Sequence, residues 1–389
     1  MWRFWIDVGG TFTDCVACDP NGQLHTWKTL SSGRLKGRVL AHQAAPDGLR
    51  LHDPGLTCTR DGFWTGWQLA LLNDASTIAT ETTVLDSTVN GELLLSSSLG
   101  EVDTQQSFEL FCDEEAPLIC IRRLLGLRLD ESLPPLELRL GTTRGTNALL
   151  ERKGARTALL TTAGFGDILQ IGSQERPDLF ALTIRKPTAL AERAVEIHER
   201  LSANGEVLEP LDVDHVRCDL QTLRRDGIEA IAICLLHAYR NPIHEQLVAQ
   251  MARDVGFAHV CCSSDVAPVI KLVPRAETTV VDAYLSPVLQ RYVDGIHQRL
   301  TPGSRFKLMT SSGGLIDAAN FSGKDSILSG PAGGVIGYAQ VAQHADALPA
   351  IGFDMGGTST DVSRYAGTLE LEPETRKAGV RLAVPTLAI

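Results

Sequence analysis

The chain has 389 residues, a formal net charge of −11 and a sequence pI near 5.4. This length predicts two or three domains, because single hydrophobic cores stop growing beyond about 250–300 residues. The acidic balance argues against nucleic acid or an anionic membrane as a partner, and no stretch approaches the roughly 18 apolar residues of a membrane span, so we expect a cytoplasmic protein.

Residues 1–32 predict a β-meander with a polar turn at its tip. An apolar strand pattern runs into Ile6-Asp7-Val8-Gly9-Gly10-Thr11-Phe12-Thr13-Asp14, and an Asn-Gly hairpin signal separates strands at 15–18 and 23–30. Glycines let backbone N–H groups approach phosphate oxygens, threonines add hydroxyl donors, and an aspartate at a strand end can hold Mg²⁺. A plain Gly-Gly hairpin turn explains this copy alone equally well.

Two cysteines in this meander have the spacing of metal ligands. Cys15 and Cys18 lack a second pair or a histidine cluster, and residues three apart on a strand face opposite sides. We therefore favour packing over metal binding. The chain has nine cysteines, an odd number that indicates reduced thiols rather than a disulfide framework.

Residues 33–135 predict a β-rich inserted domain. Strand patterns lie at 63–73, 77–85 and 92–97, and a further strand and a short helix at 108–112 and 117–125. Two tryptophans, Trp64 and Trp67, have the spacing of core aromatics, which we favour over a ligand-binding surface.

The run from Gly141 to Gly154 predicts a hydroxyl-rich helix start after the strand 136–140. Thr142 or Thr143 can cap a helix that continues through Asn147. The N-terminus of a helix is a natural anion site, although a simple N-cap explains either threonine as well.

A strand at 157–162 precedes a polar loop at 173–188. Arg176 and Arg185 in this loop are candidates for binding a substrate carboxylate, because guanidinium binds one bidentately. Solvated loop charges are the simpler interpretation. We expect a hairpin of strands 196–201 and 206–211.

From residue 212 the pattern alternates between helices and strands, which indicates parallel strands with crossover helices. We expect His237 and His244 in this region to be isolated structural residues. The expected elements are helix 213–225, strand 228–236, helix 242–255, strand 257–262, long helices through 266–300 and strand 305–310.

A glycine-rich turn at 311–314 precedes a helix that we expect from Ser329 to about Gln343. Three of its glycines, Gly333, Gly334 and Gly337, leave one face bare and predict close approach of another helix backbone.

The stretch Phe353-Asp354-Met355-Gly356-Gly357-Thr358-Ser359-Thr360-Asp361 is a second copy of the first turn. Six of nine positions match, namely Asp, Gly, Gly, Thr, Thr and Asp. The pair predicts two loops that grip one polyphosphate, with Asp7 and Asp354 holding Mg²⁺. The residues expected to steady the phosphates are Gly9, Gly10, Thr11, Thr13, Gly356, Gly357, Thr358 and Thr360. Asp14 and Asp361 can assist or cap the following strand.

Together these motifs resemble the hydantoinase A and 5-oxoprolinase family. The resemblance rests on both copies, on the Gly141–Gly154 run and on Ser329-Gly330-Pro331-Ala332-Gly333-Gly334, while Val273-Pro274-Arg275 resembles 5-oxoprolinase more closely. It implies an α/β, actin-like ATPase fold, of the type in sugar kinases and heat-shock chaperones, incomplete at the C-terminus. The implied domains are 1–32 with 136–211, the insertion 33–135, and 212–389.

The resemblance implies an ATP- and Mg²⁺-dependent enzyme that phosphorylates the lactam oxygen of 5-oxo-L-proline and drives ring opening to L-glutamate, as in glutathione metabolism. Thr142, Thr143, Asn147 and Arg176 would lie near the substrate, and Gly333 and Gly334 near the nucleotide. An ATP-dependent hydantoinase A or N-methylhydantoinase subunit is the near alternative, and an actin- or chaperone-like nucleotide-dependent clamp is the alternative from another class.

The implied partners are a small cyclic amide, a hydantoinase B-like ring-opening half, fused or separate, and a second copy of the chain in a homo-oligomer. The sequence ends at Ile389, without the further glycine-rich segment that holds adenosine in the resembled fold. We therefore expect an N-terminal fragment that binds ATP weakly and is inactive alone.

Overall fold

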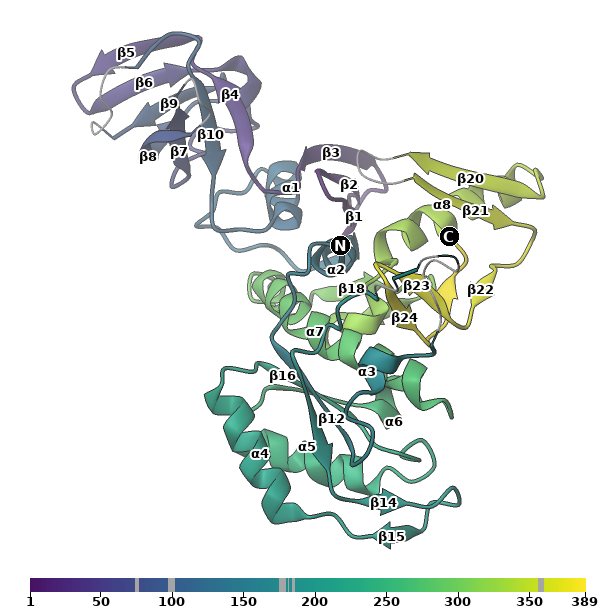
Figure 1. Cartoon of the computed structure of the whole chain (residues 1–389). Helices are drawn as coiled ribbons and strands as arrows, with labels where there is room; N and C mark the ends of the chain where they lie inside the picture. Colours follow the sequence, from purple (N-terminus) through teal and green to yellow (C-terminus); the bar gives the residue numbers. More distant parts are fainter. Residues whose placement is uncertain (74–76, 97–101, 175–179, 181, 184–185, 356–359) are drawn as a thin grey trace. The chain divides into compact units, whose positions relative to one another are not determined.

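The computed structural model of the chain describes residues 1–389 except 74–76, 97–101, 175–179, 181, 184–185 and 356–359 (Figure 1). It divides into two compact units, residues 1–141 with 292–308 and residues 142–291 with 309–389. The boundaries of these two units differ from the expected domain boundaries at residues 32, 135 and 211. That domain division therefore stays a prediction.

The first unit contains the predicted β-meander. Strands β1 (Trp2–Val8), β2 (Phe12–Cys18) and β3 (Leu24–Leu30) pair antiparallel, and Gly22 in the intervening turn has a φ of +89°. Two later strands, β11 (Leu136–Thr142) and β18 (Arg305–Met309), pair in parallel. With the short strand β19 (Leu315–Asp317) they extend the sheet in the order β19-β18-β11-β1-β2-β3. Alternate β1 residues Phe4, Ile6 and Val8 are buried, as a half-buried strand requires.

A seven-stranded antiparallel sheet occupies most of residues 35–111, in the order β4-β10-β7-β8-β9-β6-β5. Trp64 and Trp67 lie in its core at 2% and 1% exposure, with ring centroids 5.0 Å apart, which confirms the core interpretation of both residues. The strands are β4 (Leu35–Arg38), β5 (Ala41–Ala45), β6 (Gly48–His52), β7 (Gln68–Leu72), β8 (Ile78–Ser87), β9 (Glu92–Leu95) and β10 (Ser107–Phe111).

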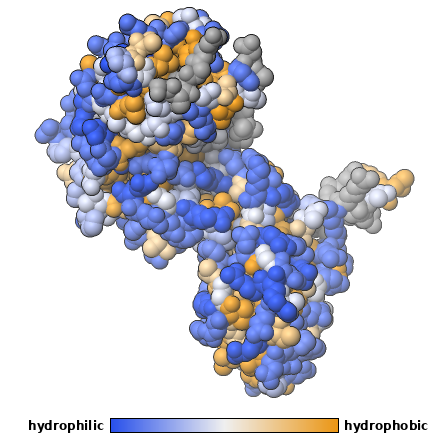
Figure 2. Space-filling view, turned by 90° about the vertical axis from the view of Figure 1, so that its left-hand side faces the viewer, coloured by the Kyte–Doolittle hydropathy of each residue, from blue (hydrophilic) through white to orange (hydrophobic). Residues whose placement is uncertain are grey.

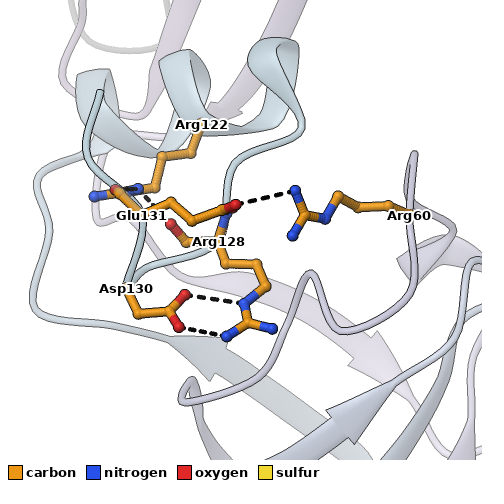
Figure 3. Close-up of polar contacts among 5 residues, drawn as sticks. All are labelled: Arg60, Arg122, Arg128, Asp130 and Glu131. Atoms are coloured by element: carbon orange, nitrogen blue, oxygen red, sulfur yellow. Dashed lines mark hydrogen bonds and ion pairs between the residues drawn. The ribbon is translucent and has the colours of Figure 1, made fainter. Parts of the chain in front are cut away.

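Helix α1 (Ala116–Leu125) packs against the meander and is followed by a polar connection to β11. Arg122 donates to the carbonyls of Arg128 and, at 2.9 Å, Glu131, whose carboxylate pairs with Arg60 (Figure 3). On its other side Arg122 makes a buried, bidentate ion pair with Glu114 at 2.6 and 2.8 Å. One guanidinium thus joins Glu114, just before α1, to the segment after α1 that leads into β11.

The second unit contains the predicted parallel sheet, in the order β13-β12-β16-β17. Its strands are β12 (Thr157–Thr162), β13 (Arg193–Ile197), β16 (Ala230–Cys234) and β17 (His259–Cys262), and its helices are α4 (Val213–Arg225), α5 (Ile243–Val255), α6 (Ser263–Val266) and α7 (Leu272–His297), the last of which continues into the first unit. The β–α alternation predicted from residue 212 onward is therefore confirmed.

Two local predictions need correction. The predicted hairpin is present but shorter than expected, because only β14 (Arg200–Leu201) pairs with β15 (Val207–Glu209), while Glu196 and Ile197 belong to the parallel strand β13. His244 is not isolated, because its Nδ1 lies 2.7 Å from a carboxylate oxygen of the buried Glu199. Glu199 also accepts a hydrogen bond from Thr162, so His244 is part of a buried polar network.

The remaining elements of the second unit are short apart from α8 (Ser329–His344), which confirms the predicted helix. The others are α2 (Arg144–Leu150), α3 (Ile168–Ile171), β19 (Leu315–Asp317), β20 (Ala350–Met355), β21 (Thr360–Tyr365), β22 (Leu371–Glu372), β23 (Thr375–Lys377), β24 (Val380–Leu382) and β25 (Thr386–Leu387). Hydrophilic residues cover most of the face drawn in Figure 2. Among the described residues, every helix is too short or too polar to cross a bilayer.

Candidate functional site

The two copies of the repeated stretch form hairpins with the same register. Asp7 pairs with Asp14 across β1 and β2, and Asp354 pairs with Asp361 across β20 and β21. The next pairs inward also correspond, Val8 with Thr13 and Met355 with Thr360. The sequence repeat is therefore a structural repeat. Gly356, Gly357 and Thr358 lie outside the described residues.

Ser31, which follows β3, forms hydrogen bonds with the first loop, residues 9–12. Its hydroxyl donates to the Gly9 carbonyl at 2.7 Å, and its N–H donates to the Thr11 carbonyl at 2.9 Å. The buried Thr13 hydroxyl lies 3.0 Å from the Ser31 hydroxyl, so Thr13 supports the loop, while Gly10 and Thr11 are exposed at its tip. Sequence reasoning missed Ser31, because only the register of β2 and β3 brings it beneath the loop.

Each hairpin places two carboxylates directly opposite one another, an arrangement that is unfavourable for like charges. In the first hairpin Lys28 on β3 reaches both oxygens of Asp14, at 2.7 and 2.8 Å. Asp14 thus takes part in a cross-strand ion pair, and Asp7 on the same hairpin is exposed.

The second hairpin lies against α8 and lines a cavity of about 260 Å³ with it. Asp354, Asp361 and Gly334 line this cavity together, so the structure brings three of the predicted site residues into one place. Tyr338 of α8 forms another wall and its hydroxyl accepts a hydrogen bond from Ser363 at 3.1 Å. Thr360, at the start of β21, is exposed.

The close helix contact predicted at Gly333, Gly334 and Gly337 is wrong. A Cβ built at each of the three would meet no heavy atom of the described chain within 4 Å, apart from neighbouring helix backbone. The glycines leave open space there, which is compatible with a bound group beside Gly333 and Gly334.

The side-chain capping predicted at the Gly-Thr-Thr run is not found, because the N-cap of α2 is Thr143 and its side chain makes no capping hydrogen bond. Thr142 is the residue before this N-cap. Its Oγ1 accepts from the Arg144 N–H at 3.1 Å at the start of α2, and its own N–H donates to Ser329 Oγ at 3.3 Å. A Cβ on Gly145 would lie only 2.0 Å from Ser326 Oγ. The α2 start is therefore packed directly against the start of α8.

The remaining substrate candidates are less informative. Asn147 donates to Thr143 Oγ1 at 3.4 Å within α2, and Arg176 and Arg185 lie outside the described residues.

The 311–314 turn was not assigned a role from sequence. In the structure, Ser311 Oγ accepts a hydrogen bond from the Leu328 N–H at 3.0 Å, just before α8. Burial raises the pKa of the neighbouring Asp325.

Asp7 belongs to the first unit and Asp354 to the second. A cleft shared by both acids therefore stays a prediction. Among the described residues, no group of three or more His, Cys, Asp or Glu side chains is arranged to hold a metal. Mg²⁺ usually takes several of its ligands from water and substrate phosphates.

Comparison with known sequences gives two family matches. The hydantoinase/oxoprolinase N-terminal region matches residues 3–50 and 99–256, and the hydantoinase/oxoprolinase domain matches residues 275–389. The interval between 50 and 99 falls within the seven-stranded sheet, which spans β4 to β10.

Individual relatives with similar sequences point to the same family. The 5-oxoprolinase of Saccharomyces cerevisiae is 44% identical over 315 residues, and 5-oxoprolinase 1 of Arabidopsis thaliana is 42% identical over 308 residues. Both alignments cover 71% of this chain and 24% of the relative, so the chain spans about a quarter of the length of these proteins. The acetophenone carboxylase gamma subunit of Aromatoleum aromaticum is 32% identical over 61% of the chain and 35% of its own length.

Two solved structures share the mixed α/β fold over 99% of this chain and 47% of their own chains. Nucleotide-free acetone carboxylase has a TM-score of 0.68 at 21% identity, a likeness of fold alone. The ATP-dependent caprolactamase of Pseudomonas jessenii has a TM-score of 0.64 at 25% identity. With both family regions matched over most of its length, this chain belongs to the hydantoinase/oxoprolinase family.

Proposed function

We propose that this chain forms the nucleotide-handling part of an ATP-dependent enzyme that opens 5-oxo-L-proline to L-glutamate. The observation that carries the proposal is the pair of hairpins with identical register, each presenting an aspartate beside a Gly-Gly-Thr turn. The likeness to two 5-oxoprolinases and to an ATP-dependent caprolactamase supports a cyclic amide as the substrate class.

We further propose that the fold is of the actin-like ATPase type. In that arrangement the two hairpins lie in different halves of the protein and face one triphosphate. The chain order fits this proposal, because the first hairpin comes at residues 2–18, α8 at 329–344 and the second hairpin at 350–365.

The acids present fit a magnesium ion. Mg²⁺ is usually held by one or two carboxylates together with substrate phosphates and waters. Asp354 and Asp361 face the same cavity from opposite strands, where a cation would relieve their mutual repulsion. Asp7 has the position on the first hairpin that Asp354 has on the second, so Asp7 and Asp354 are the proposed ligands, and Asp361 assists.

When bound, Mg·ATP would supply a phosphoryl group to the amide oxygen, the nucleophilic end of the resonance-stabilised amide. The residues of this chain would position the phosphate groups and neutralise their charge. Gly10 and Thr11 at the exposed tip would contact phosphate oxygens, while Ser31 and Thr13 keep the loop in shape. Ring opening by water would take place in a hydantoinase B-like half, fused or separate.

The test measures ADP release by the intact protein that contains this chain. We expect 5-oxo-L-proline to stimulate release, and hydantoin and an unfolded polypeptide to stimulate it less. A dominant response to hydantoin would favour the hydantoinase alternative, and a response to unfolded polypeptide alone would favour a nucleotide-dependent clamp.

Two variants test the proposed metal ligands. Asp7→Asn and Asp354→Asn should each reduce turnover by at least about a hundredfold while leaving the fold intact, because each removes a metal-binding charge. Asp254→Asn, at an exposed acid on α5, is the matched control. Unimpaired turnover in Asp7→Asn and Asp354→Asn would remove both acids from the site.

A further inference from the structure

The second unit contains a larger cavity that the proposed phosphate site does not use. Its volume is about 650 Å³, within the range of about 300–1,000 Å³ that is usual for small-molecule sites. One wall is the segment 164–173, which includes α3, and the other is the start of α7 at 271–274. Phe165, Ile168 and Leu272 give it a largely apolar lining.

The wall formed by α7 is firmly anchored. Arg275 is fully buried, and its guanidinium donates to the Leu235 carbonyl at 2.6 Å, just after strand β16. The N–H of the same Leu235 donates to the buried Glu245 at 3.0 Å. The Arg275 bond therefore ties the start of α7 to the end of β16, whose following residue Leu235 is held in turn by Glu245.

Three charged side chains line the cavity, the cations Lys271 and Arg381 and the carboxylate Asp167. Lys271 is exposed at its edge, and among the described residues no carboxylate forms an ion pair with it. The other lining cation, Arg381, pairs with Glu374 at 3.1 Å and Glu277 at 3.4 Å. Lys271 is therefore the lining cation that forms no ion pair with a described carboxylate.

Lys271 directly precedes α7, at the N-terminal end of that helix. Its carbonyl accepts from the Arg275 N–H at 3.3 Å, which places it at the N-terminal end of a 26-residue helix. A cation is unfavourable at this positive end of the helix dipole, whereas an anion is stabilised there. An anion in the cavity would thus be attracted by the ammonium group and by the helix together.

We infer that this cavity binds the cyclic amide substrate itself, and that Lys271 pairs with a carboxylate on the ring. The inference rests on the proposed function and names its substrate class, a small lactam that bears a carboxylate. Phe165, Ile168 and Leu272 pack against the ring methylenes, and Asp167, which also lines the cavity, accepts a hydrogen bond from the amide N–H.

The experiment compares two lactams that differ only in the carboxylate, 5-oxo-L-proline and 2-pyrrolidinone, as stimulants of ADP release by the intact protein. Lys271→Met should raise the KM for 5-oxo-L-proline tenfold or more and leave the KM for 2-pyrrolidinone unchanged. Lys271→Arg should restore most of the affinity, because it keeps the charge. Lys153→Met, at an exposed lysine outside the cavity, is the control and should change neither KM.

The outcomes separate this inference from the proposed function. Wild-type stimulation by 5-oxo-L-proline with an unchanged KM in Lys271→Met, or with an equal rise for both lactams, overturns the inference alone. If no lactam stimulates the wild type, the proposed function fails, and equilibrium dialysis of labelled 5-oxo-L-proline, with and without a non-hydrolysable ATP analogue, decides the inference. Binding that is lost in Lys271→Met keeps the site, and binding that is absent or independent of Lys271 overturns it.

Discussion

A single glycine determines how the second hairpin meets α8. A Cβ at Gly352 would lie 2.2 Å from the nearest atom of the Tyr338 ring. We predict that Gly352→Ala destabilises the protein by about 1–3 kcal/mol, because an added methyl group forces a well-packed neighbour to move. Thermal unfolding measures the change, and Tyr338→Ala in the same chain should relieve most of it.

Gly337, on α8, provides a control, because its substitution should change the stability in the opposite direction. A Cβ at Gly337 meets open space on the described chain, and the residue lies inside the helix. Gly337→Ala should stabilise the protein by about 0.5–1 kcal/mol, because alanine loses less backbone freedom in a helix. Equal effects of both substitutions would contradict the packing argument.

Helix α1 depends on a buried ion pair. The Arg122 and Glu114 side chains are only 5% and 1% exposed. We predict that Arg122→Met costs about 3–5 kcal/mol, because it leaves a buried carboxylate without its partner. Equilibrium unfolding in urea measures the loss.

Two further variants test the origin of this effect. Adding Glu114→Leu to Arg122→Met should recover much of the stability, since the unpaired charge is then gone. Arg128→Ala breaks a solvent-exposed pair with Asp130 and should leave the urea midpoint nearly unchanged (Figure 3). A loss in Arg128→Ala as large as that in Arg122→Met would contradict the role of burial.

At the scale of elements, the sequence predicted those helices and turns that depend on residues close to one another in the chain. The amphipathic helix 213–225 was predicted to its end residues, and the Asn-Gly turn correctly separated β2 from β3. The strand expected at 196–201 failed, because residues 198–199 interrupt it and Glu199 turns inward to bond Thr162 and His244. Those partners are distant in sequence, so no local periodicity reports them.

At the scale of the whole molecule, the sequence identified the repeat but not its surroundings. The matching residues at 6–14 and 353–361 predicted two similar turns, and their equal register bears this out. The cavity shared by Asp354, Asp361 and Gly334 depends on how β20 packs against α8. The support from Ser31 depends on strand pairing. Such contacts arise from tertiary packing, which a single sequence does not display.

The cysteines offer a test of packing across both units. Of the nine, only Cys218 is exposed. Burial raises the pKa of Cys234 to about 11 and that of Cys262 to about 12. Because the thiolate is the reactive form, and its fraction falls about tenfold for each unit by which the pKa exceeds the pH, these thiols remain protonated at pH 8.

We therefore predict that iodoacetamide at pH 8 modifies Cys218 in the native protein and leaves Cys234 and Cys262 intact, as read by mass spectrometry of peptides. Cys218→Ser should remove nearly all native labelling, and labelling in denaturant should reach every cysteine, because unfolding exposes the thiols and returns their pKa values to the ordinary range. Since Cys15 and Cys120 are buried in the first unit and Cys234 and Cys262 lie in the second, the denaturant concentration at which each pair becomes reactive reports the opening of its own unit. Modification of Cys234 in the native protein as fast as that of Cys218 would contradict the packing of the parallel sheet described above.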